Sequence, residues 1–509
     1  MRRCWYQFGA FFIALGTNAS PGVLSPNDYL EKGDLLLSHG DNEQAIGMYK
    51  RGIQFMENDP DDTFSLTTKI SMYTNLATAL SAKEENEEAA NFYQQALVLY
   101  QQEINEIVDP AMKQEITLIA AQAAFFLGMV YQDLGIAQDA ADAYQYAYEL
   151  DPMHWSAMAN LGAVYHDLLS KHDQALLAYN KAYNILINAS DEEPPTDPPP
   201  EPRYILSQLQ YRIGLCLSHD KNKKCALDDA PTRPVDCQTM AAHAFSLAVE
   251  YDDTNEAAKH MLASITADAT IERASNKYVK SLFDEYAKNF EESLVGDLGY
   301  TGYERLRRGF DRAMAKEGGT LVDNQLFDLV VDAGCGTGLV GEQFRNISKR
   351  MIGVDLSQAI LDQAKSKRPG LYDEMIAGDV MQVFRKRSGE ISLIIAGDSY
   401  IYFGDLEPLF AAMEEGLAEG GYAAFTLENV DIESEHTLTE SAKPKWRWQL
   451  TASGRFAHRK EYVSSVAQAY QLQPLHYEAM DGFRFERGVG VRGHLFVVQK
   501  QSGSRNEEL

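Results

Sequence analysis

The 509-residue sequence is poor in cysteine, in basic residues and in long apolar runs, and each shortage excludes a class of protein. Its five cysteines form no C-x-x-C pair, so no metal site is expected. Lys and Arg number 46 against 74 Asp and Glu. The net charge of −28 argues against a nucleic acid as the main partner, because neutralising phosphates takes a concentrated basic face. The first apolar stretch, Cys4 to Leu15, is too short to span a membrane, and no other segment is expected to span one.

The two ends and one internal stretch have distinctive composition. Arg2 and Arg3 precede a short apolar run and then small residues, which is the pattern of a targeting leader. Residues 1–25 are therefore expected to be a leader or a disordered tail, and 501–509 a disordered tail. Cys225 and Cys237 share a polar insertion, residues 218–240, and would pair in an oxidising compartment. Free thiols are the favoured interpretation.

The first half of the chain contains an internal repeat. Leu127-Gly128 recurs 34 residues later as Leu161-Gly162, and Tyr144 recurs as Tyr179 after one inserted residue. The period and the residue types resemble tetratricopeptide repeats (TPRs), which stack helical hairpins into an all-α solenoid. In such hairpins Gly or Ala lets two helices approach, and an aromatic ring is expected to fill the space between neighbouring hairpins.

The repeats predict a TPR array over residues 26–268. An acidic, proline-rich loop, residues 190–202, interrupts it and is expected to be a spacer. Asn255 to Ile265 is expected to be the capping helix. Because TPR arrays bind peptide segments in a concave groove, the resemblance implies a protein or peptide partner.

The second half is organised around Phe327 to Gly341, FDLVVDAGCGTGLVG. Its apolar start predicts a strand buried on both faces of a parallel sheet. Gly334, Gly336 and Gly338 then allow a sharp turn and close approach to a ligand.

Two cofactor classes fit this turn. G-x-G-x-x-G, formed by Gly336, Gly338 and Gly341, is the dinucleotide fingerprint, with Asp355 at about the spacing of its ribose-binding acid. The whole string, VVDAGCGTG, instead resembles motif I of the class I S-adenosylmethionine (SAM) methyltransferases. Asp332 favours SAM, because a carboxylate there suits the cationic amino-acid end of SAM and would repel a pyrophosphate.

Further acids follow the next predicted strands. Asp355, Asp379 and Asp398 come after apolar runs that end at Val354, Ala377 and Ala396. Ligands bind at the carboxyl ends of the strands in open α/β sheets, so these acids are expected to meet in one cleft. Asp355 would accept both ribose hydroxyls, and the resemblance implies that Asp379 lies near the adenine.

The segment before the sheet, Ile271 to Arg308, contains FDEYAKNF. It resembles the lid of small-molecule SAM methyltransferases, which implies that Tyr278, Phe283 and Asp284 contact SAM; packing of an amphipathic helix is the plainer alternative. The full set of predicted cofactor-binding residues is Tyr278, Phe283, Asp284, Asp332, Gly334, Cys335, Gly336, Gly338, Asp355, Leu356, Asp379 and Val380.

These motifs together resemble a family of TPR-containing methyltransferases related to ubiquinone-biosynthesis enzymes. The implied architecture is a TPR solenoid followed, over 271–500, by a Rossmann-like, seven-stranded class I methyltransferase domain whose last strand is antiparallel. The implied activity is methyl transfer from SAM to a small molecule or a protein. The alternative is a TPR scaffold with an inactive or SAM-sensing domain.

Three residues are candidates for a catalytic base, if the acceptor needs one. His458 is the first, in a string of aromatic and basic residues before the final hairpin, and Tyr400 and Asp398 follow. For His458, a buried hydrogen-bonding role is the alternative. Because SAM is made in the cytosol, a cytoplasmic location is expected, with an organelle reached through the leader as the alternative.

Overall fold

In a computed structural model, the chain forms two compact units, residues 1–255 and 256–509. The structure describes residues 25–58, 64–188, 200–219, 224–227, 230–266, 270–287, 290–316, 326–429, 447–486 and 489–501. The expected leader, most of the proline-rich loop, much of the polar insertion and the last eight residues therefore lie outside the described residues.

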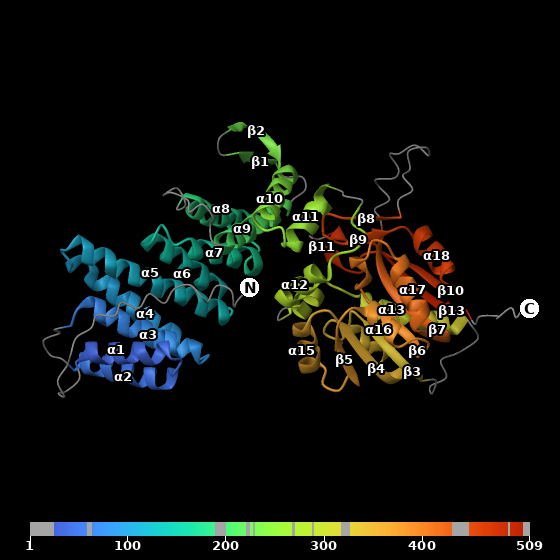
Figure 1. The fold of residues 1–509 in the computed structure, drawn as a ribbon, viewed down its shortest axis with the longest axis horizontal. Helices are drawn as coiled ribbons and strands as arrows, with labels where there is room; N and C mark the ends of the chain where they lie inside the picture. The colour runs from blue at the N-terminus through green and yellow to red at the C-terminus, as the bar shows by residue number, and fades with distance from the viewer. Residues whose placement is uncertain are drawn as a thin grey trace, which may run out of the picture. The chain divides into compact units, whose positions relative to one another are not determined.

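The first unit is a succession of helices in antiparallel pairs (Figure 1). They are α1 (Pro26–Ser38), α2 (Asn42–Glu57), α3 (Leu66–Ala82), α4 (Asn86–Glu103), α5 (Pro110–Asp133), α6 (Ala137–Leu150), α7 (Trp155–Ala163), α8 (His172–Asn188), α9 (Pro200–Ser218) and α10 (Cys237–Tyr251). A short hairpin of β1 (Lys224–Leu227) and β2 (Ala230–Asp236) precedes α10. The predicted all-α repeat region is confirmed.

In several of the helical hairpins, a glycine on one helix packs against an aromatic ring of the other. A Cβ on Gly128 would stand 2.7 Å from the ring of Tyr144, and one on Gly162 would stand 2.7 Å from that of Tyr179. Both rings are almost fully buried. The prediction that glycine permits close approach is thus confirmed, but the ring packs within its own hairpin, because it takes the space of the missing side chain.

Helix α5 is the described helix that is long and apolar enough to cross a membrane by length and composition. Half of its apolar stretch is buried inside the molecule. Gly128, near its end, holds the ring of Tyr144 in α6. These contacts are those of a core helix in the repeat stack.

Cys237, the first residue of α10, is disulfide-bonded. The expectation of a free thiol at this position is therefore wrong. Cys216 and Cys335 are free and buried.

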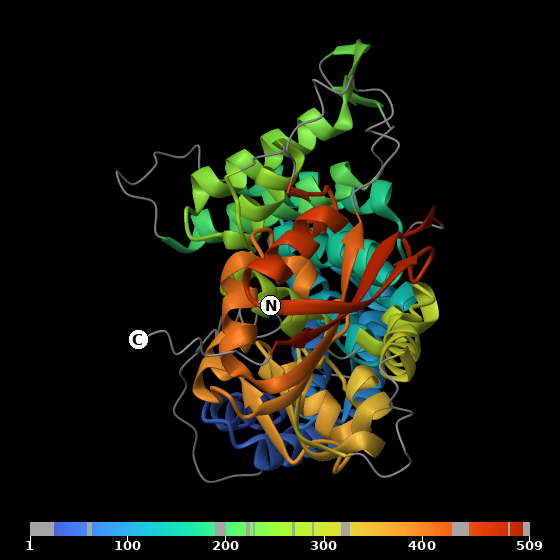
Figure 2. The same ribbon diagram turned by 90° about the vertical axis from the view of Figure 1, so that its right-hand side faces the viewer.

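The second unit is a sheet covered by helices, seen from a second side in Figure 2. Its helices are α11 (Glu256–Thr266), α12 (Asn276–Tyr286), α13 (Gly302–Lys316), α14 (Leu339–Phe344), α15 (Gln358–Lys367), α16 (Val380–Lys386), α17 (Glu407–Gly416) and α18 (Lys460–Ala469). Its strands are β3 (Phe327–Ala333), β4 (Ser348–Asp355), β5 (Glu374–Ala377), β6 (Ile391–Ala396), β7 (Leu417–Asn429), β8 (Trp448–Leu450), β9 (Phe456–His458), β10 (Leu472–Met480), β11 (Phe485–Glu486), β12 (Val489–Gly490) and β13 (Gly493–Lys500).

The described strands of the main sheet run in the order β10-β13-β7-β6-β3-β4-β5, with β8 and β9 attached beside β7. Strands β5, β4, β3, β6 and β7 are parallel, and β13 is antiparallel to both of its neighbours. The predicted seven-stranded, doubly wound sheet is confirmed. Parallel pairing brings the carboxyl ends of β3, β4, β5 and β6 to one edge.

Helix α11 is part of the second unit, whereas the sequence predicted it to cap the repeats. His260 on α11 hydrogen-bonds to the Gly454 carbonyl at 2.7 Å and stacks on Tyr278 with ring centroids 4.3 Å apart. These contacts fix α11 to the sheet unit.

The glycine–ring contact gives a testable prediction. We expect Gly128→Ala to lower the free energy of unfolding by about 1–3 kcal/mol, because the new methyl group overpacks against Tyr144. Gly47→Ala, also within a helix but with no atom within 4 Å of the added Cβ, is the control and should raise it by about 0.5–1 kcal/mol. Chemical denaturation followed by circular dichroism measures both; equal changes would contradict the packing role.

Candidate functional site

A cavity of about 150 Å³ opens at the carboxyl edge of the sheet. Its lining comes from α12 and the segment that precedes it, the turn after β3, and the ends of β4, β5 and β6. Most of the lining is apolar or aromatic. Predicted cofactor-binding residues in the lining are Phe283, Gly334, Gly336, Asp355, Leu356, Asp379 and Val380.

At one end of the cavity, the turn after β3 meets the end of β4. The Gly336 N–H donates to Asp355 Oδ2 at 3.1 Å, and the Ser357 N–H donates to Oδ1 at 3.0 Å. Burial raises the pKa of Asp355, and these backbone hydrogen bonds oppose that rise. Gly336 has a φ of +54°, and a Cβ on it would stand 3.4 Å from Phe290 across the cavity. A ligand in the cavity can therefore approach the backbone of Gly336 closely, next to the Asp355 carboxylate.

Asp379 begins α16 and caps it, accepting from the Met381 N–H at 2.8 Å. Its other oxygen accepts from Arg273 Nη2 at 2.8 Å and from Asn276 Nδ2 at 3.1 Å. Burial alone would raise the pKa of Asp379, but these two side chains outweigh it and lower the pKa. Arg273 also lies over the Phe403 ring, 4.3 Å from its centroid. The acid is therefore held ionised at the cavity wall.

The other glycines of the turn serve packing. A Cβ on Gly334 would overlap the side chain of Ser399, whose hydroxyl donates to the Ala333 carbonyl at 2.6 Å. A Cβ on Gly338 would stand 2.7 Å from Leu371, away from the cavity. The sequence predicted ligand contact for all three glycines; Gly334 and Gly336 line the cavity, and Gly338 does not.

Asp332 does not line the cavity, contrary to its expected place beside the amino-acid end of SAM. Its carboxylate is fully buried, and Oδ2 accepts from the Tyr372 hydroxyl at 2.7 Å, whereas Oδ1 has no partner among the described residues. Burial raises its pKa to about 7. The side chain points to the sheet face covered by α14, because Oδ2 lies 2.8 Å from a Cβ placed on Gly341. Asp332 therefore packs between the turn region and Tyr372 and does not face the cavity.

The far end of the cavity holds a buried charge cluster. Asp398 follows β6 with a φ of +54°, a strained conformation for a residue other than glycine. Arg484, 1% exposed, forms ion pairs with Asp398 and with Glu428 on β7. Thr426 donates to Asp398 Oδ1 at 3.3 Å. The carboxylate is thus committed to structural partners, and Asp398 is not available as the expected base.

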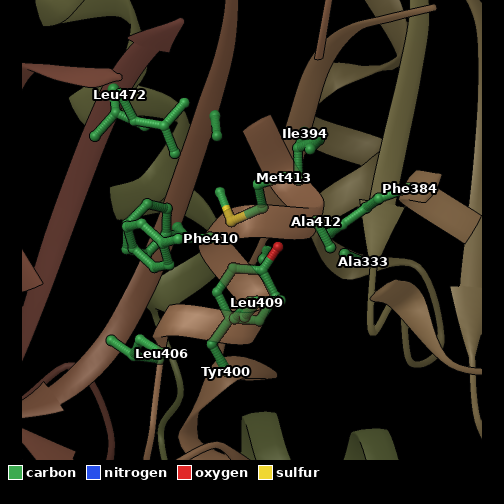
Figure 3. Packing of buried hydrophobic residues seen from close by; sticks show 14 of the residues in the cluster. Ala333, Phe384, Ile394, Tyr400, Leu406, Leu409, Phe410, Ala412, Met413 and Leu472 are labelled. Atoms are coloured by element: carbon green, nitrogen blue, oxygen red, sulfur yellow. The ribbon is translucent and has the colours of Figure 1, made fainter. Parts of the chain in front are cut away.

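Tyr400 contributes to the lining but directs its hydroxyl elsewhere. Figure 3 shows the ring among Leu409, Ala412 and Met413 of α17, with the oxygen inside this apolar cluster. The oxygen has no hydrogen-bond partner among the described atoms, and burial raises its pKa. The side chain belongs to the core, so the predicted role of Tyr400 as a base is not supported.

His458 is also a buried side chain outside the cavity lining. Its Nε2 hydrogen-bonds to the Gly404 carbonyl at 3.1 Å, and its own carbonyl accepts from His494 Nε2 at 3.1 Å. Burial lowers its pKa to about 4. The predicted catalytic position is therefore replaced by a structural one that joins β9 to its neighbours.

Three further predicted residues lie outside the lining. Tyr278 packs on α11, Cys335 is buried in the turn, and Asp284 accepts from the Ser357 hydroxyl at 2.6 Å. Asp284 thus joins α12 to Ser357, the residue that caps the start of α15.

Known proteins resemble both units. The family model described as methyltransferase domain matches residues 330–421. This part of the chain is a methyltransferase domain.

Relatives cover only parts of the chain. The TPR repeat-containing protein MJ1428 of Methanocaldococcus jannaschii is 26% identical over 184 residues, 31% of this chain and 30% of that protein. Magnesium-protoporphyrin O-methyltransferase of Rhodobacter capsulatus is 29% identical over 100 residues, 20% of this chain and 45% of that protein. The chain thus spans less than half of either relative.

A solved structure of magnesium protoporphyrin IX methyltransferase from Synechocystis PCC 6803, with bound SAH, covers 44% of this chain and 99% of its own. The identity is 13% and the TM-score 0.33.

Several residues of the methyltransferase domain that line the cavity were not predicted from the sequence. They are Arg273, Asn276, Tyr300 and Arg484. Arg273 and Arg484 pair with acids that are 106 and 86 positions away in the sequence. A search for basic residues flanking the acids would have found neither.

The buried Asp332 gives a pH prediction for the methyltransferase domain. Its folded-state pKa of about 7 lies above the ordinary aspartate value of 3.8, so the folded state binds the extra proton and the free energy of unfolding falls as pH rises between these values. The full loss is on the order of 4 kcal/mol. We expect Asp332→Asn to flatten this part of the profile, measured by urea unfolding from pH 4 to 8; an unchanged slope would contradict a raised pKa.

Proposed function

We propose that the chain is a SAM-dependent methyltransferase, with the adenosine held between Asp355 and Asp379. The observation that carries this proposal is the Asp355 carboxylate, exposed to the cavity beside the open backbone of Gly336. Carboxylate oxygens can accept from both ribose hydroxyls, and the near absence of side chains at the turn admits a flat nucleoside. The residues present therefore fit an adenine nucleoside.

When bound, SAM supplies an activated methyl group on a sulfonium, which leaves in an in-line displacement. The chain's own contribution is alignment and exclusion of water. Phe283, Phe290 and Tyr402 meet edge-on, with centroids 5.6 and 5.8 Å from Phe283, and form an apolar wall of the cavity. Aromatic faces also favour a sulfonium cation over water.

For the repeats we propose binding of a protein or peptide partner. The support is the stacked hairpins, which leave large apolar side chains exposed, among them Leu35, Leu177 and Val98. The name of the Rhodobacter relative, an O-methyltransferase, supports oxygen as the acceptor atom.

The cytosol, which makes SAM, is the proposed compartment. The disulfide at Cys237 favours the alternative of an organelle, because the cytosol keeps such bonds reduced.

The rival function is a TPR scaffold whose methyltransferase domain senses SAM without transferring a methyl group. Labelled SAM added to cell extract separates the two, since the scaffold binds SAM but transfers no label.

Binding of SAM tests the proposed site directly. We expect Asp355→Ala and Gly336→Val to weaken SAM binding at least about 100-fold, because one removes the ribose acceptor and the other fills the turn. Isothermal titration calorimetry measures the affinity. Asp328→Ala, an exposed acid on the same strand as the turn, is the control and should leave it unchanged. Wild-type affinity for SAM in both variants would contradict the proposed SAM site.

A further inference from the structure

The described lining of the cavity offers no side chain that is ready to take a proton. It contains no His, Lys or Cys. Each lining carboxylate is engaged: Asp355 by backbone N–H groups, Asp379 by Arg273, and Asp398 by Arg484. Asp379 and Asp398 are paired with guanidinium groups, and Asp355 is assigned to the ribose in the proposed function, so none of the three is placed to take a proton from the acceptor.

The tyrosines of the lining are proton donors at neutral pH. Burial raises the pKa of Tyr300, Tyr400 and Tyr402. A neutral phenol can donate a hydrogen bond to an acceptor, but it cannot remove a proton from one.

Tyr300 has a buried hydroxyl without a partner at the inner edge of this lining. Its side chain is 3% exposed, and its oxygen has no hydrogen-bond partner among the described atoms. The oxygen lies 3.1 Å from a Cβ placed on Gly397, the residue directly after β6 and itself part of the lining. An unpartnered buried hydroxyl is costly, and a ligand atom in the cavity would satisfy it.

Two guanidinium groups line the cavity. The charge of Arg484 is neutralised by its ion pairs with Asp398 and Glu428, whereas Arg455 is hydrogen-bonded to the Tyr402 hydroxyl. Arginine side chains match the planar geometry of a carboxylate and repel an amine. Phe403 and Ile401 add apolar surface to the cavity lining.

We propose that the acceptor is a carboxylate on an apolar molecule, oriented by the Tyr300 hydroxyl and the Arg455 guanidinium. This inference rests on the proposed function and names its substrate class. A carboxylate is already ionised at neutral pH, so its methylation needs no catalytic base. An alcohol or phenol would require one.

The balance of the step is simple. A lone pair of the carboxylate oxygen forms the new bond to the methyl carbon, the bond from that carbon to sulfur breaks, and the electron pair stays on sulfur. The products are a methyl ester and neutral S-adenosylhomocysteine. No proton is released.

The chemistry of the product tests the proposal. The full-length protein is incubated with methyl-labelled SAM and an extract of its native cells, and the products are divided by ultrafiltration. We expect label that mild alkali releases as volatile methanol, since esters hydrolyse under conditions in which ethers and methylamines survive. Release from the small-molecule fraction supports the proposed apolar carboxylic acid, and release from the retained fraction would overturn it in favour of a protein carboxylate.

The role of Tyr300 is tested with a variant that removes only its hydroxyl. We expect Tyr300→Phe to lower the rate of ester formation roughly 10- to 100-fold at subsaturating acceptor, with SAM affinity unchanged within about twofold. Tyr303→Phe is the matched control, since this neighbouring ring, 5.9 Å away, does not line the cavity. Loss of SAM affinity in Tyr300→Phe would place the hydroxyl on the cofactor and overturn its assignment, as would an equal loss of rate in the control.

Alkali-stable label would overturn the carboxylate assignment while leaving the methyltransferase intact. Absence of transferred label with SAM binding retained would overturn it in favour of the scaffold. Failure to bind SAM would instead reject the proposed function itself, so the two failures are distinguishable.

Discussion

The site depends on one set of backbone hydrogen bonds between strand ends. The N–H groups of Gly334 and Cys335 both donate to the Val354 carbonyl, at 2.8 and 2.9 Å, and the Gly378 N–H donates to the Asp355 carbonyl at 2.8 Å. These bonds continue the parallel pairing of β3, β4 and β5 past the last strand residues. They require a turn with positive φ, which glycine adopts at little cost. Asp355 and Asp379 come to one edge of the cavity because these hydrogen bonds fix the backbone beside them.

Much of this was predictable from the sequence, because it depends on local patterns. Continuous apolar runs of strand length, each followed by a glycine or an acid, mark the ends of β3 to β6, and the structure places these ends together. The helical hairpins were equally predictable, since the repeated Gly–Tyr spacing indicates a ring packed against the glycine of the neighbouring helix. Asp355 and Asp379 follow from the same logic, since each side chain comes directly after a strand.

Side-chain direction was not predictable in the same way. Asp332 and Asp355 both lie near the carboxyl ends of parallel strands, yet Asp355 lines the cavity and Asp332 does not. Tyr400 lies in a short 3₁₀ helix and contributes to the cavity lining, but its hydroxyl lies in the apolar core (Figure 3). Arg273 and Arg484 reach their acids from distant segments, so no local spacing announces them. His458 was misjudged because its motif resembles a site, whereas its burial excludes it.

Arg484, Asp398 and Glu428 form a buried cluster of charges beside the cavity. Two carboxylates and one guanidinium are taken almost entirely out of water, and such desolvation can exceed the Coulombic gain. The same ion pairs hold Asp398 in a backbone conformation that a non-glycine residue rarely adopts. A purely structural contact would be served as well by apolar side chains. The ion pairs instead fix Asp398 and Arg484 as polar groups of the cavity lining, near the Tyr300 hydroxyl, which has no hydrogen-bond partner among the described atoms.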